Sequence, residues 1–335
     1  MCTEKKLRVA IIGCGTVSAN HIAAIKDYGK ADIVALCDTK PERAMARSEQ
    51  YGLSAKIYES YDEMLENEAL DVVHIATPHY LHVPQAIAAL KKNINVFLEK
   101  PMAISVEEIK ALLEAEKESK GKLTVCFQNR FNNTTVTAKK IVDEDGGALE
   151  CYASVFWQRN EKYYTESGWR GKYATEGGGV MINQAIHTID LLCFFLGIPQ
   201  KVSATIANHH LKGVIEVEDS CGGRISFENG KIANFYATNA CVSFDATTLF
   251  IKTKNHKIEI LSTRRIYVDG KEISAEEQRK CVGKECYGIG HFDAISRFYN
   301  SVLKGTDVPV TAESAQYALR ILLAAYKSFG EDVEV

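Results

Sequence analysis

Two glycines that follow an apolar segment constrain the fold of this chain more than any other feature. Residues 7–12 read Leu-Arg-Val-Ala-Ile-Ile, Gly13-x-Gly15-x-x-Ser18 comes next, and residues 20–28 have a helical pattern. In such a strand–turn–helix unit, the first glycine makes a tight turn. The second lets the backbone approach a pyrophosphate, which the helix N-terminus attracts. Ser18 stands where glycine or alanine is usual, which is a mild departure from the motif. The turn nevertheless predicts a dinucleotide site at the start of an α/β domain.

Strand and helix patterns alternate through the first third of the chain. The apolar strand candidates are residues 7–12, 32–37, 71–76, 94–98 and 123–127, and the helical stretches between them are 20–28, 41–51, 60–67, 82–92 and 105–119. This alternation implies right-handed crossovers and a parallel sheet covered on both faces. We therefore predict a doubly wound Rossmann domain over residues 1–124.

The pattern changes after about residue 125. Residues 224–238 alternate between apolar and polar on both sides of Asn229-Gly230, a strong hairpin signal, and Asp269-Gly270 offers a second turn. Further strand candidates are residues 149–157, 201–207 and 247–261, with helices near 180–196, 291–304 and 312–329. Because 335 residues are too many for one ordinary core, we predict a second, α+β domain over residues 125–335 with a mostly antiparallel sheet.

Asp38 ends the second strand candidate, where a carboxylate can accept hydrogen bonds from both hydroxyls of a ribose. A 2′-phosphate at that place would put two anions in contact, so the sequence predicts NAD rather than NADP. Lys40, two residues later, leaves the exclusion of NADP incomplete.

The next strand candidate ends in Thr77-Pro78-His79-Tyr80-Leu81-His82. Ligands of open α/β sheets lie outside the carboxyl ends of the strands, so we expect this segment to line the cofactor cleft. His79 and His82 have an i, i+3 spacing that metal ligands also use. No third imidazole or carboxylate lies near them in sequence, and we do not predict a metal site.

Lys100 lies in the tripeptide Glu99-Lys100-Pro101, directly after the apolar residues 96–98. An amine at the end of a buried strand has its pKa lowered by burial, which makes it a usable proton donor or acceptor near neutral pH. Many lysines at strand ends simply reach water, so the position alone does not establish chemistry.

A helix over residues 180–196 begins after three consecutive glycines, residues 177–179, which suit a backbone packed close to a ligand. Asn183 and His187 share one face of it, and Asp190 lies one turn further on. A histidine held by an acid near a lysine is a plausible proton-transfer pair. The alternative is a histidine that packs under the helix, with Asp190 pairing it structurally.

Together these pieces resemble the Gfo/Idh/MocA family of NAD(P)-dependent oxidoreductases, which includes glucose-fructose oxidoreductase and inositol 2-dehydrogenase, along nearly the whole chain. The matching pieces are residues 10–15, Asp38, Thr77-Pro78-x-x-x-His82, Glu99-Lys100-Pro101, Gln128-Asn129-Arg130-Phe131, Trp169-Arg170-Gly171, Gly177-Gly178-Gly179 and Asn183-x-x-x-His187-x-x-Asp190. The resemblance implies a Rossmann domain followed by an open-faced sheet that builds homodimers or homotetramers.

The resemblance also implies roles for individual residues. Lys100 and His187 are the expected catalytic groups. The expected cofactor contacts are Gly13, Gly15, Thr16, Val17, Asp38, Thr77, Pro78, His82, Glu99, Lys100 and Gln128. The expected substrate contacts are Lys100, Arg130, Trp169, Arg170, Asn183, His187 and His291. Many relatives carry aspartate at the position of Asn183, and an amide cannot titrate, so Lys100 and His187 are expected to carry the proton transfer.

Composition excludes several other classes. A net charge of −3 offers no footprint for nucleic acid, and the longest apolar run is far shorter than the roughly 20 residues of a membrane span. The ten cysteines include no C-x-x-C pair, the closest being Cys281 and Cys286, and they are expected to be small buried hydrophobes. The N-terminus has no secretory pattern, so we expect a cytoplasmic protein. The spacing of the cysteines and histidines gives no reason to expect a bound metal.

The sequence thus predicts an enzyme that moves a hydride between NAD and a secondary hydroxyl of a sugar, nucleotide sugar or cyclitol. One alternative is an enzyme that cleaves glycosides through transient oxidation at C3, as some relatives do. Another is a non-catalytic NAD-binding sensor, which would need neither Lys100 nor His187.

Overall fold

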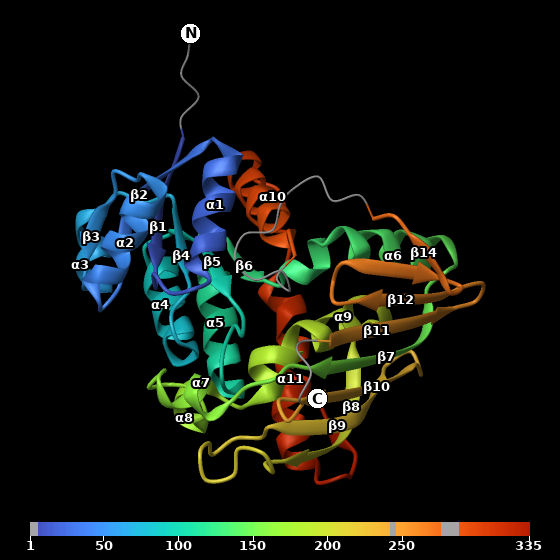
Figure 1. Cartoon of the computed structure of the whole chain (residues 1–335). Helices are drawn as coiled ribbons and strands as arrows, with labels where there is room; N and C mark the ends of the chain where they lie inside the picture. Colours follow the sequence, from blue (N-terminus) through green and yellow to red (C-terminus); the bar gives the residue numbers. More distant parts are fainter. Residues whose placement is uncertain (1–5, 242–245, 276–287) are drawn as a thin grey trace.

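The computed structural model describes residues 6–241, 246–275 and 288–335 of the chain, which form two sheets, one in each half of the molecule (Figure 1). Cys2, Cys281, Cys286 and Tyr287 lie outside the described residues.

The first sheet has six parallel strands in the order β3-β2-β1-β4-β5-β6. Its strands are β1 Leu7–Ile12, β2 Ala31–Cys37, β3 Lys56–Tyr58, β4 Val72–Ile75, β5 Asn95–Glu99 and β6 Leu123–Cys126. The helices between them are α1 Ser18–Tyr28, α2 Pro41–Tyr51, α3 Tyr61–Asn67, α4 His82–Lys91 and α5 Val106–Glu118, with a 3₁₀ turn at His79–Leu81. This is the predicted doubly wound sheet, and it brings the carboxyl ends of its strands to one edge.

The second sheet has nine strands in the order β14-β13-β12-β11-β7-β10-β9-β8-β15. They are β7 Ala148–Phe156, β8 Pro199–Ala207, β9 Ser220–Phe227, β10 Ile232–Thr238, β11 Ala246–Thr253, β12 Lys257–Leu261, β13 Arg265–Val268, β14 Lys271–Ile273 and β15 Val333–Glu334. β7 and β10 pair in parallel, and the other neighbouring strands pair antiparallel. The mostly antiparallel second sheet is thus confirmed.

The remaining helices cover and connect the two sheets. They are a 3₁₀ turn Gln128–Phe131, α6 Asn133–Glu144, α7 Glu161–Thr165, α8 Tyr173–Glu176, a π-helical turn Met181–Ala185, α9 Ile186–Leu196, α10 Gly290–Lys304 and α11 Ala312–Ser328. α9 packs on β7, and α11 packs on β8 and α9. α10 returns to the first half, where it packs against α1 (Figure 1). The predicted domain boundary at residues 124 and 125 falls inside β6 and remains a prediction.

The hairpins predicted from Asn229-Gly230 and Asp269-Gly270 are present as β9–β10 and β13–β14. Three helices, α6, α7 and α8, and the edge strand β3 were not predicted. α6 reads Asn-Thr-Thr-Val-Thr in its first turns, and β-branched residues are weak helix formers, so the surrounding packing decides its conformation. The other three elements are too short to show a period.

The helical stretch Tyr173–Leu196 is long and apolar enough to cross a membrane by length and composition. Its most apolar window is 83% buried inside the protein, and a core helix of a globular protein passes the same test. No other helix among the described residues meets these criteria.

Candidate active site

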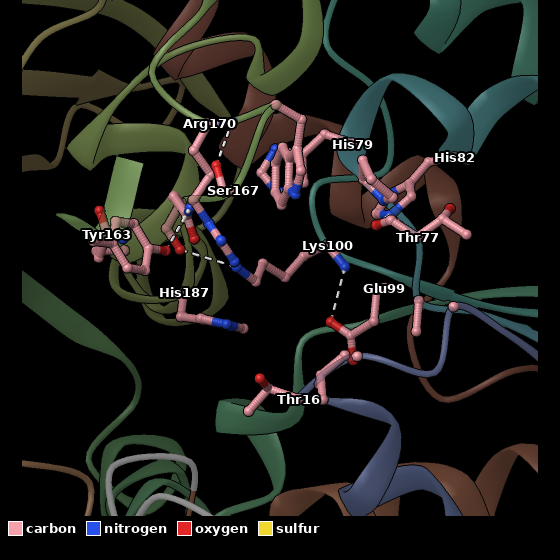
Figure 2. A pocket seen from close by; sticks show the side chains of 18 of the residues that line it. Thr16, Thr77, His79, His82, Glu99, Lys100, Tyr163, Ser167, Arg170 and His187 are labelled. Carbon is pink, nitrogen blue, oxygen red and sulfur yellow. Dashed lines mark hydrogen bonds between the residues drawn. The ribbon is translucent and has the colours of Figure 1, made fainter. Parts of the chain in front are cut away.

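One cavity of about 740 Å³ begins at the carboxyl ends of β1, β2, β4 and β5 and continues beside α7, the segment that follows α7, and the start of α9 (Figure 2). Its wall contains the following predicted site residues: Gly13, Gly15, Thr16, Val17, Asp38, Thr77, Pro78, His82, Glu99, Lys100, Gln128, Trp169, Arg170, Asn183, His187 and His291. The fold therefore brings residues from both halves of the chain to a single cavity.

The two glycines of the first turn differ in what surrounds them. Gly13 has a φ of +86°, and a Cβ there would lie 2.5 Å from the backbone oxygen of Ala76, so this position requires glycine. A Cβ on Gly15 would meet nothing within 4 Å, because Gly15 faces the cavity. α1 begins beside it without a side-chain cap and without an acid in its first turn. These are the features of a backbone cradle that accepts a phosphate anion.

Asp38 is fixed in the wall by two backbone donors, since its carboxylate accepts hydrogen bonds from the N–H groups of Cys14 and Lys40, both at 2.9 Å. The guanidinium of Arg43 lies 4.0 Å away. The carboxylate thus stands at the end of β2 facing the cavity that Gly15 lines, which is the arrangement that a ribose requires. The residues present fit a nicotinamide dinucleotide.

Lys100 follows β5 and extends into the middle of the cavity (Figure 2). Its Nζ donates a hydrogen bond of 2.9 Å to the backbone oxygen of Asn183, which joins the two halves of the site. Burial lowers the pKa of Lys100 from its ordinary value and Arg170 lowers it further, against the opposing effect of Glu99 and Glu176. A lowered pKa increases the share of neutral amine, the form that can accept a proton.

Behind Lys100, a buried chain of polar side chains ends on Glu99. Tyr299 Oη lies 2.7 Å from His74 Nε2, His74 Nδ1 lies 2.8 Å from His21 Nδ1, and His21 Nε2 lies 2.9 Å from Glu99 Oε1. Burial holds the pKa of His74 well below its ordinary value, so His74 is neutral. One assignment of tautomers then satisfies every contact: each group donates to the next, and the last hydrogen bond reaches the carboxylate of Glu99.

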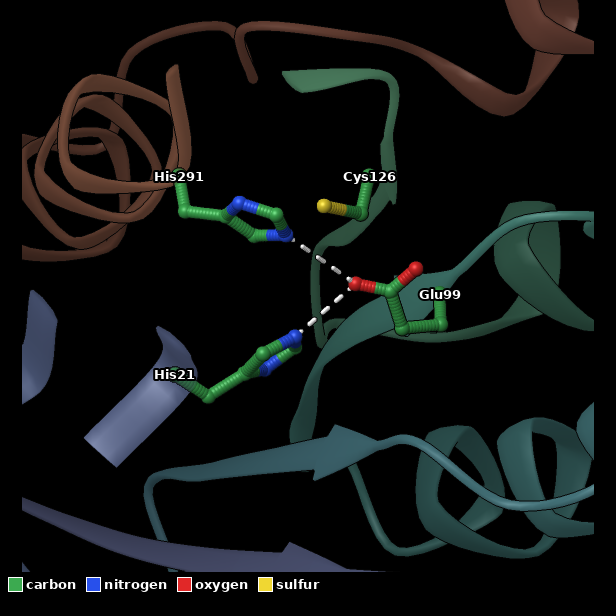
Figure 3. A group of neighbouring side chains, drawn as sticks. All are labelled: His21, Glu99, Cys126 and His291. Atoms are coloured by element: carbon green, nitrogen blue, oxygen red, sulfur yellow. Dashed lines mark hydrogen bonds and ion pairs between the residues drawn. The ribbon is translucent and has the colours of Figure 1, made fainter. Parts of the chain in front are cut away.

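Glu99 also faces His291 Nε2 at 3.6 Å, and Cys126 lies beside both (Figure 3). Burial alone would raise the pKa of Glu99, but hydrogen bonds from His21 and His291 outweigh it and hold the pKa well below its usual range. Glu99 is therefore an anion next to Lys100. The ligand atoms of these four side chains lie within 4.8 Å of one another. The hydrogen bond to Glu99 accounts for the position of His21, and His291 lies within ion-pair distance of the same carboxylate.

The glycine run before the π-helical turn is packed against Glu218. The buried carboxylate of Glu218 accepts hydrogen bonds from the N–H groups of Gly179 and Met181 and from the hydroxyl of Tyr326. A Cβ on Gly179 would lie 1.8 Å from the backbone oxygen of Glu218, so only glycine fits. The turn that follows carries Asn183 and opens α9, where His187 lies in the first turn. π-helical turns of this kind often occur at functional sites.

His187 faces the cavity below Lys100 (Figure 2). Burial, assisted by Lys100, holds the pKa of His187 well below its ordinary value, so the ring is neutral. Its Nδ1 is buried and has no hydrogen-bond partner among the described residues.

Asp190, expected beside His187, instead forms a two-pronged ion pair with Arg130. Arg130 donates from Nε at 2.8 Å and from a terminal nitrogen at 2.6 Å to the two oxygens of Asp190. Arg130 is not part of the cavity wall, and its guanidinium also lies over the ring of Phe127. The structure therefore does not bring Arg130 to the other expected substrate contacts, and its charge is already neutralised by a buried acid.

Sequence reasoning missed Glu176, a fully buried carboxylate at the end of α8. It accepts hydrogen bonds from the N–H of Gly171 and from Nδ2 of Asn183, which also donates to Tyr163 Oη at 3.2 Å. Both contacts fix the amide so that Oδ1 remains as an acceptor for a ligand. Burial raises the pKa of Glu176 to about 7. An acid directly before three glycines was the available signal.

The two histidines that follow β4, His79 and His82, both contact backbone oxygens of neighbouring segments. Nδ1 of His82 faces the backbone oxygen of Pro101 at 2.7 Å and Nε2 faces that of Thr77 at 2.9 Å, so the ring links two loops of the cavity. His79 Nδ1 lies 2.7 Å from the backbone oxygen of Glu176, and its ring packs edge-on against Trp169.

Comparison with known proteins identifies the family of this chain. Residues 7–127 match the family model described as "Oxidoreductase family, NAD-binding Rossmann fold", and residues 135–267 match the GFO/IDH/MocA C-terminal domain. The chain belongs to the Gfo/Idh/MocA family. It is an NAD-dependent oxidoreductase that acts on CH–OH groups, as the names of its relatives and the NADH complexes of its structural neighbours indicate.

The chain is similar in sequence or structure to the following three proteins, among others. D-glucoside 3-dehydrogenase of Escherichia coli is 26% identical over 96% of this chain and 95% of its own length. Inositol 2-dehydrogenase of Salmonella typhimurium is 31% identical over 41% of each chain. The WlbA dehydrogenase from Bordetella pertussis, solved in complex with NADH and UDP-GlcNAcA, superposes with a TM-score of 0.86 at 28% identity and covers 99% of both chains.

The first prediction compares the two glycines. Gly15→Ala adds a methyl group in open cavity space, so we expect a free energy of unfolding within about 0.5 kcal/mol of the parent and NADH binding at least ~10-fold weaker. Gly13→Ala is expected to lose about 2 kcal/mol or more, because its Cβ meets backbone at a positive φ. Urea unfolding and NADH fluorescence titration measure both. Unweakened NADH binding by Gly15→Ala would contradict the assignment.

The second prediction concerns Glu176, whose pKa of about 7 lies above the ordinary 4.5. The folded state then holds the proton more tightly than the unfolded state, so this carboxyl lowers stability as pH rises from about 4.5 through about 7. The loss amounts to about 3 kcal/mol, at ~1.4 kcal/mol per pKa unit. Glu176→Gln does not titrate and should gain stability relative to the parent over that range.

Chemical unfolding between pH 4.5 and pH 8 measures the difference between the two proteins. The exposed acid Glu66 supplies the control, because Glu66→Gln should leave the pH dependence of the parent unchanged. A constant difference between Glu176→Gln and the parent at every pH would show that Glu176 has no raised pKa.

Proposed function

We propose that this enzyme transfers a hydride between NAD and a secondary hydroxyl of a sugar, a nucleotide sugar or a cyclitol. The observation that carries the proposal is the amine of Lys100, with its lowered pKa, in the cavity that also contains the dinucleotide turn and Asp38. The names of two relatives, a D-glucoside 3-dehydrogenase and an inositol 2-dehydrogenase, and the UDP-GlcNAcA bound to WlbA support these substrate classes.

In the proposed oxidation, the carbinol carbon loses a hydride and its hydroxyl loses a proton, so that the alcohol becomes a ketone. NAD, when bound, supplies the hydride acceptor. Lys100 as the neutral amine takes the hydroxyl proton, and neutral His187 provides a second hydrogen-bonding group for the same oxygen. Oδ1 of Asn183 accepts a hydrogen bond from a neighbouring hydroxyl, which orients the ring. In the reduction, Lys100 returns the proton to the ketone.

We assign the cofactor to the end of the cavity formed by Gly13, Gly15, Thr16, Val17 and Asp38. The nicotinamide end would then reach the segment formed by Thr77, Pro78, Glu99, Lys100 and Gln128, all of which line the same cavity. The substrate would occupy the remaining space, beside Trp169, Arg170, Asn183, His187 and His291.

The third prediction tests the role of Lys100. Lys100→Met keeps the length of the side chain but removes its amine, so we expect kcat to fall by ~10²-fold or more while NADH binding is retained. A panel of sugars, cyclitols and glucosides is incubated with NAD and followed at 340 nm. The matched control, Lys92→Met, changes an exposed lysine at the end of α4 and should retain full activity. Near-normal turnover by Lys100→Met would overturn the assignment.

The same assay separates the alternative functions. Net formation of NADH indicates a dehydrogenase. Release of the aglycone from a glucoside without net NADH indicates glycoside cleavage through transient oxidation. NADH binding without turnover of any member of the panel indicates a sensor.

We also propose that the protein is a homo-oligomer that uses the open face of the nine-stranded sheet. Helices α9 and α11 pack against this sheet, while aromatic side chains of its central strands remain exposed, among them Tyr152 at 47% and Tyr236 at 45%. Tyr152 stacks on Phe250 of the neighbouring strand at 4.5 Å between ring centroids. Exposed aromatic side chains on a sheet face that no helix among the described residues covers favour association with a second copy. A cytoplasmic location remains a prediction from the sequence.

The fourth prediction concerns this face. Light scattering after size exclusion should give a dimer or tetramer for the parent protein and a smaller particle for the double variant Tyr152→Lys/Tyr236→Lys, because two charges would be buried at the interface. Met45→Lys, at an exposed apolar residue of α2, is the control and should not change the mass. A monomeric parent protein would contradict the proposal.

A further inference from the structure

Two arginines at the substrate end of the cavity have no acid to neutralise them among the residues that the structure describes. Arg159 lies in the segment after β7, and Arg170 lies between α7 and α8. In the part of the chain that the structure describes, no carboxylate comes within ion-pair distance, 4.0 Å, of either guanidinium. The Nε atom of each is also shielded from water and lacks a hydrogen-bond partner among those residues.

Aromatic rings hold both guanidiniums in position. The guanidinium carbon of Arg159 lies 5.1 Å from the ring centroid of Trp157 and 4.7 Å from that of Tyr163. The same atom of Arg170 lies 4.5 Å from the centroid of Tyr163 and 4.7 Å from that of Trp169. An arginine stacked in this way loses little further freedom when it binds a ligand. Tyr163 thus stands between two cations that are already oriented.

The nearby acids do not supply the missing partner. Glu176 is committed to the N–H of Gly171 and to Asn183, and its raised pKa leaves it partly protonated near neutral pH. Glu166, which also lines the cavity, lies 3.5 Å from Lys162. Lys100 adds a further amine to the same space. The balance of charge at this end of the cavity therefore favours an anion.

A buried donor without an acceptor costs free energy, and an unpaired cation costs more. Nε1 of Trp157, on the same side of the cavity as Arg159, is a further buried donor with no partner among the described residues. Several buried charges of the site are paired: Asp38 and Glu218 accept backbone donors, and Asp190 is bound to Arg130. Because these unpaired N–H donors lie together, we infer that a bound ligand supplies their hydrogen-bond acceptor.

We propose that Arg159 and Arg170 bind an oxyanion group of the substrate, so that the enzyme acts on an acidic sugar derivative. The inference rests on the proposed function and narrows its substrate class. Planar guanidinium groups bind carboxylate and phosphate with paired hydrogen bonds, so the anion is either the carboxylate of a sugar acid or the phosphate of a sugar phosphate or nucleotide sugar. Arg170 contacts Tyr163, which contacts Asn183, whose backbone oxygen binds Lys100. Because Arg159, Arg170 and Lys100 line one cavity, a single ligand can carry both the oxyanion and the reacting hydroxyl.

The test uses the full-length protein saturated with NADH, so that binding is measured without turnover. The probes are D-glucose, D-glucuronate, D-glucose 6-phosphate and UDP-glucuronate, with binding followed by calorimetry. We expect at least one charged probe to bind ~10-fold or more tightly than D-glucose. A preference for D-glucuronate indicates a carboxylate site, and a preference for the two phosphorylated probes indicates a phosphate site. Equal binding of charged and neutral probes, or no binding of any charged probe, would overturn the proposal.

Substitutions of the two arginines test whether they cause the preference for charged probes. Arg170→Gln and Arg159→Gln should each reduce the affinity for the charged probe by ~10-fold or more, a change of ~1.4 kcal/mol, and should reduce the affinity for D-glucose much less. The control is Arg224→Gln, which removes an exposed charge paired with Asp332 on the distant sheet and should change neither. Unchanged NADH affinity confirms that the variants fold. Full charge preference in both arginine variants would overturn the proposal.

The oxidation assay distinguishes this inference from the proposed function. Oxidation of neutral and charged sugars at equal rates would leave the oxidoreductase assignment in place and remove the anion site. Tight binding of a charged probe without oxidation of any sugar would retain the anion site and remove the proposed reaction.

Discussion

The amine of Lys100 is bound to the backbone oxygen of Asn183, and this hydrogen bond joins the two halves of the active site. Lys100 belongs to the end of the parallel sheet, whereas Asn183 belongs to the π-helical turn that leads into α9 on the second sheet. The turn can stand there only because Gly179 allows the backbone of Glu218 to approach. A charged group at a buried strand end thus depends on a contact between segments 83 residues apart.

Paired and unpaired polar groups divide the site into a framework and a binding surface. The chain from Tyr299 to Glu99 pairs every group along it, so these buried side chains hold the base of the site and keep Glu99 anionic beside Lys100. At the other end, the Nε atoms of Arg159 and Arg170 remain without partners among the described residues. Because unpaired buried donors are costly, this contrast separates the groups that stabilise the fold from those that await a ligand.

Much of the site could be predicted because its residues lie at fixed places in a repeated pattern. Gly13, Asp38 and Lys100 each follow an apolar strand, and parallel strands bring their carboxyl ends to one edge. Side-chain pairing could not be predicted in the same way. Asp190 follows His187 by three residues but binds Arg130, 60 positions away, because an arginine satisfies both oxygens of a buried carboxylate. Glu176 was missed because its place before three glycines does not reveal its contact with Asn183, which forms only in the folded chain.

The sequence by itself determined the alternation of strands and helices, the two hairpins, the dinucleotide turn and the family. These depend on periodicity, on glycines at turns and on residues close together in the chain. Only the tertiary structure decided which charges are neutralised. It paired Arg130 with Asp190 outside the cavity wall and placed Glu176 behind Asn183. It left Arg159 and Arg170 facing the cavity with no carboxylate within ion-pair distance among the described residues. Burial and the partners across the fold set the free energy of each charge, and neither can be read from neighbouring residues in the sequence.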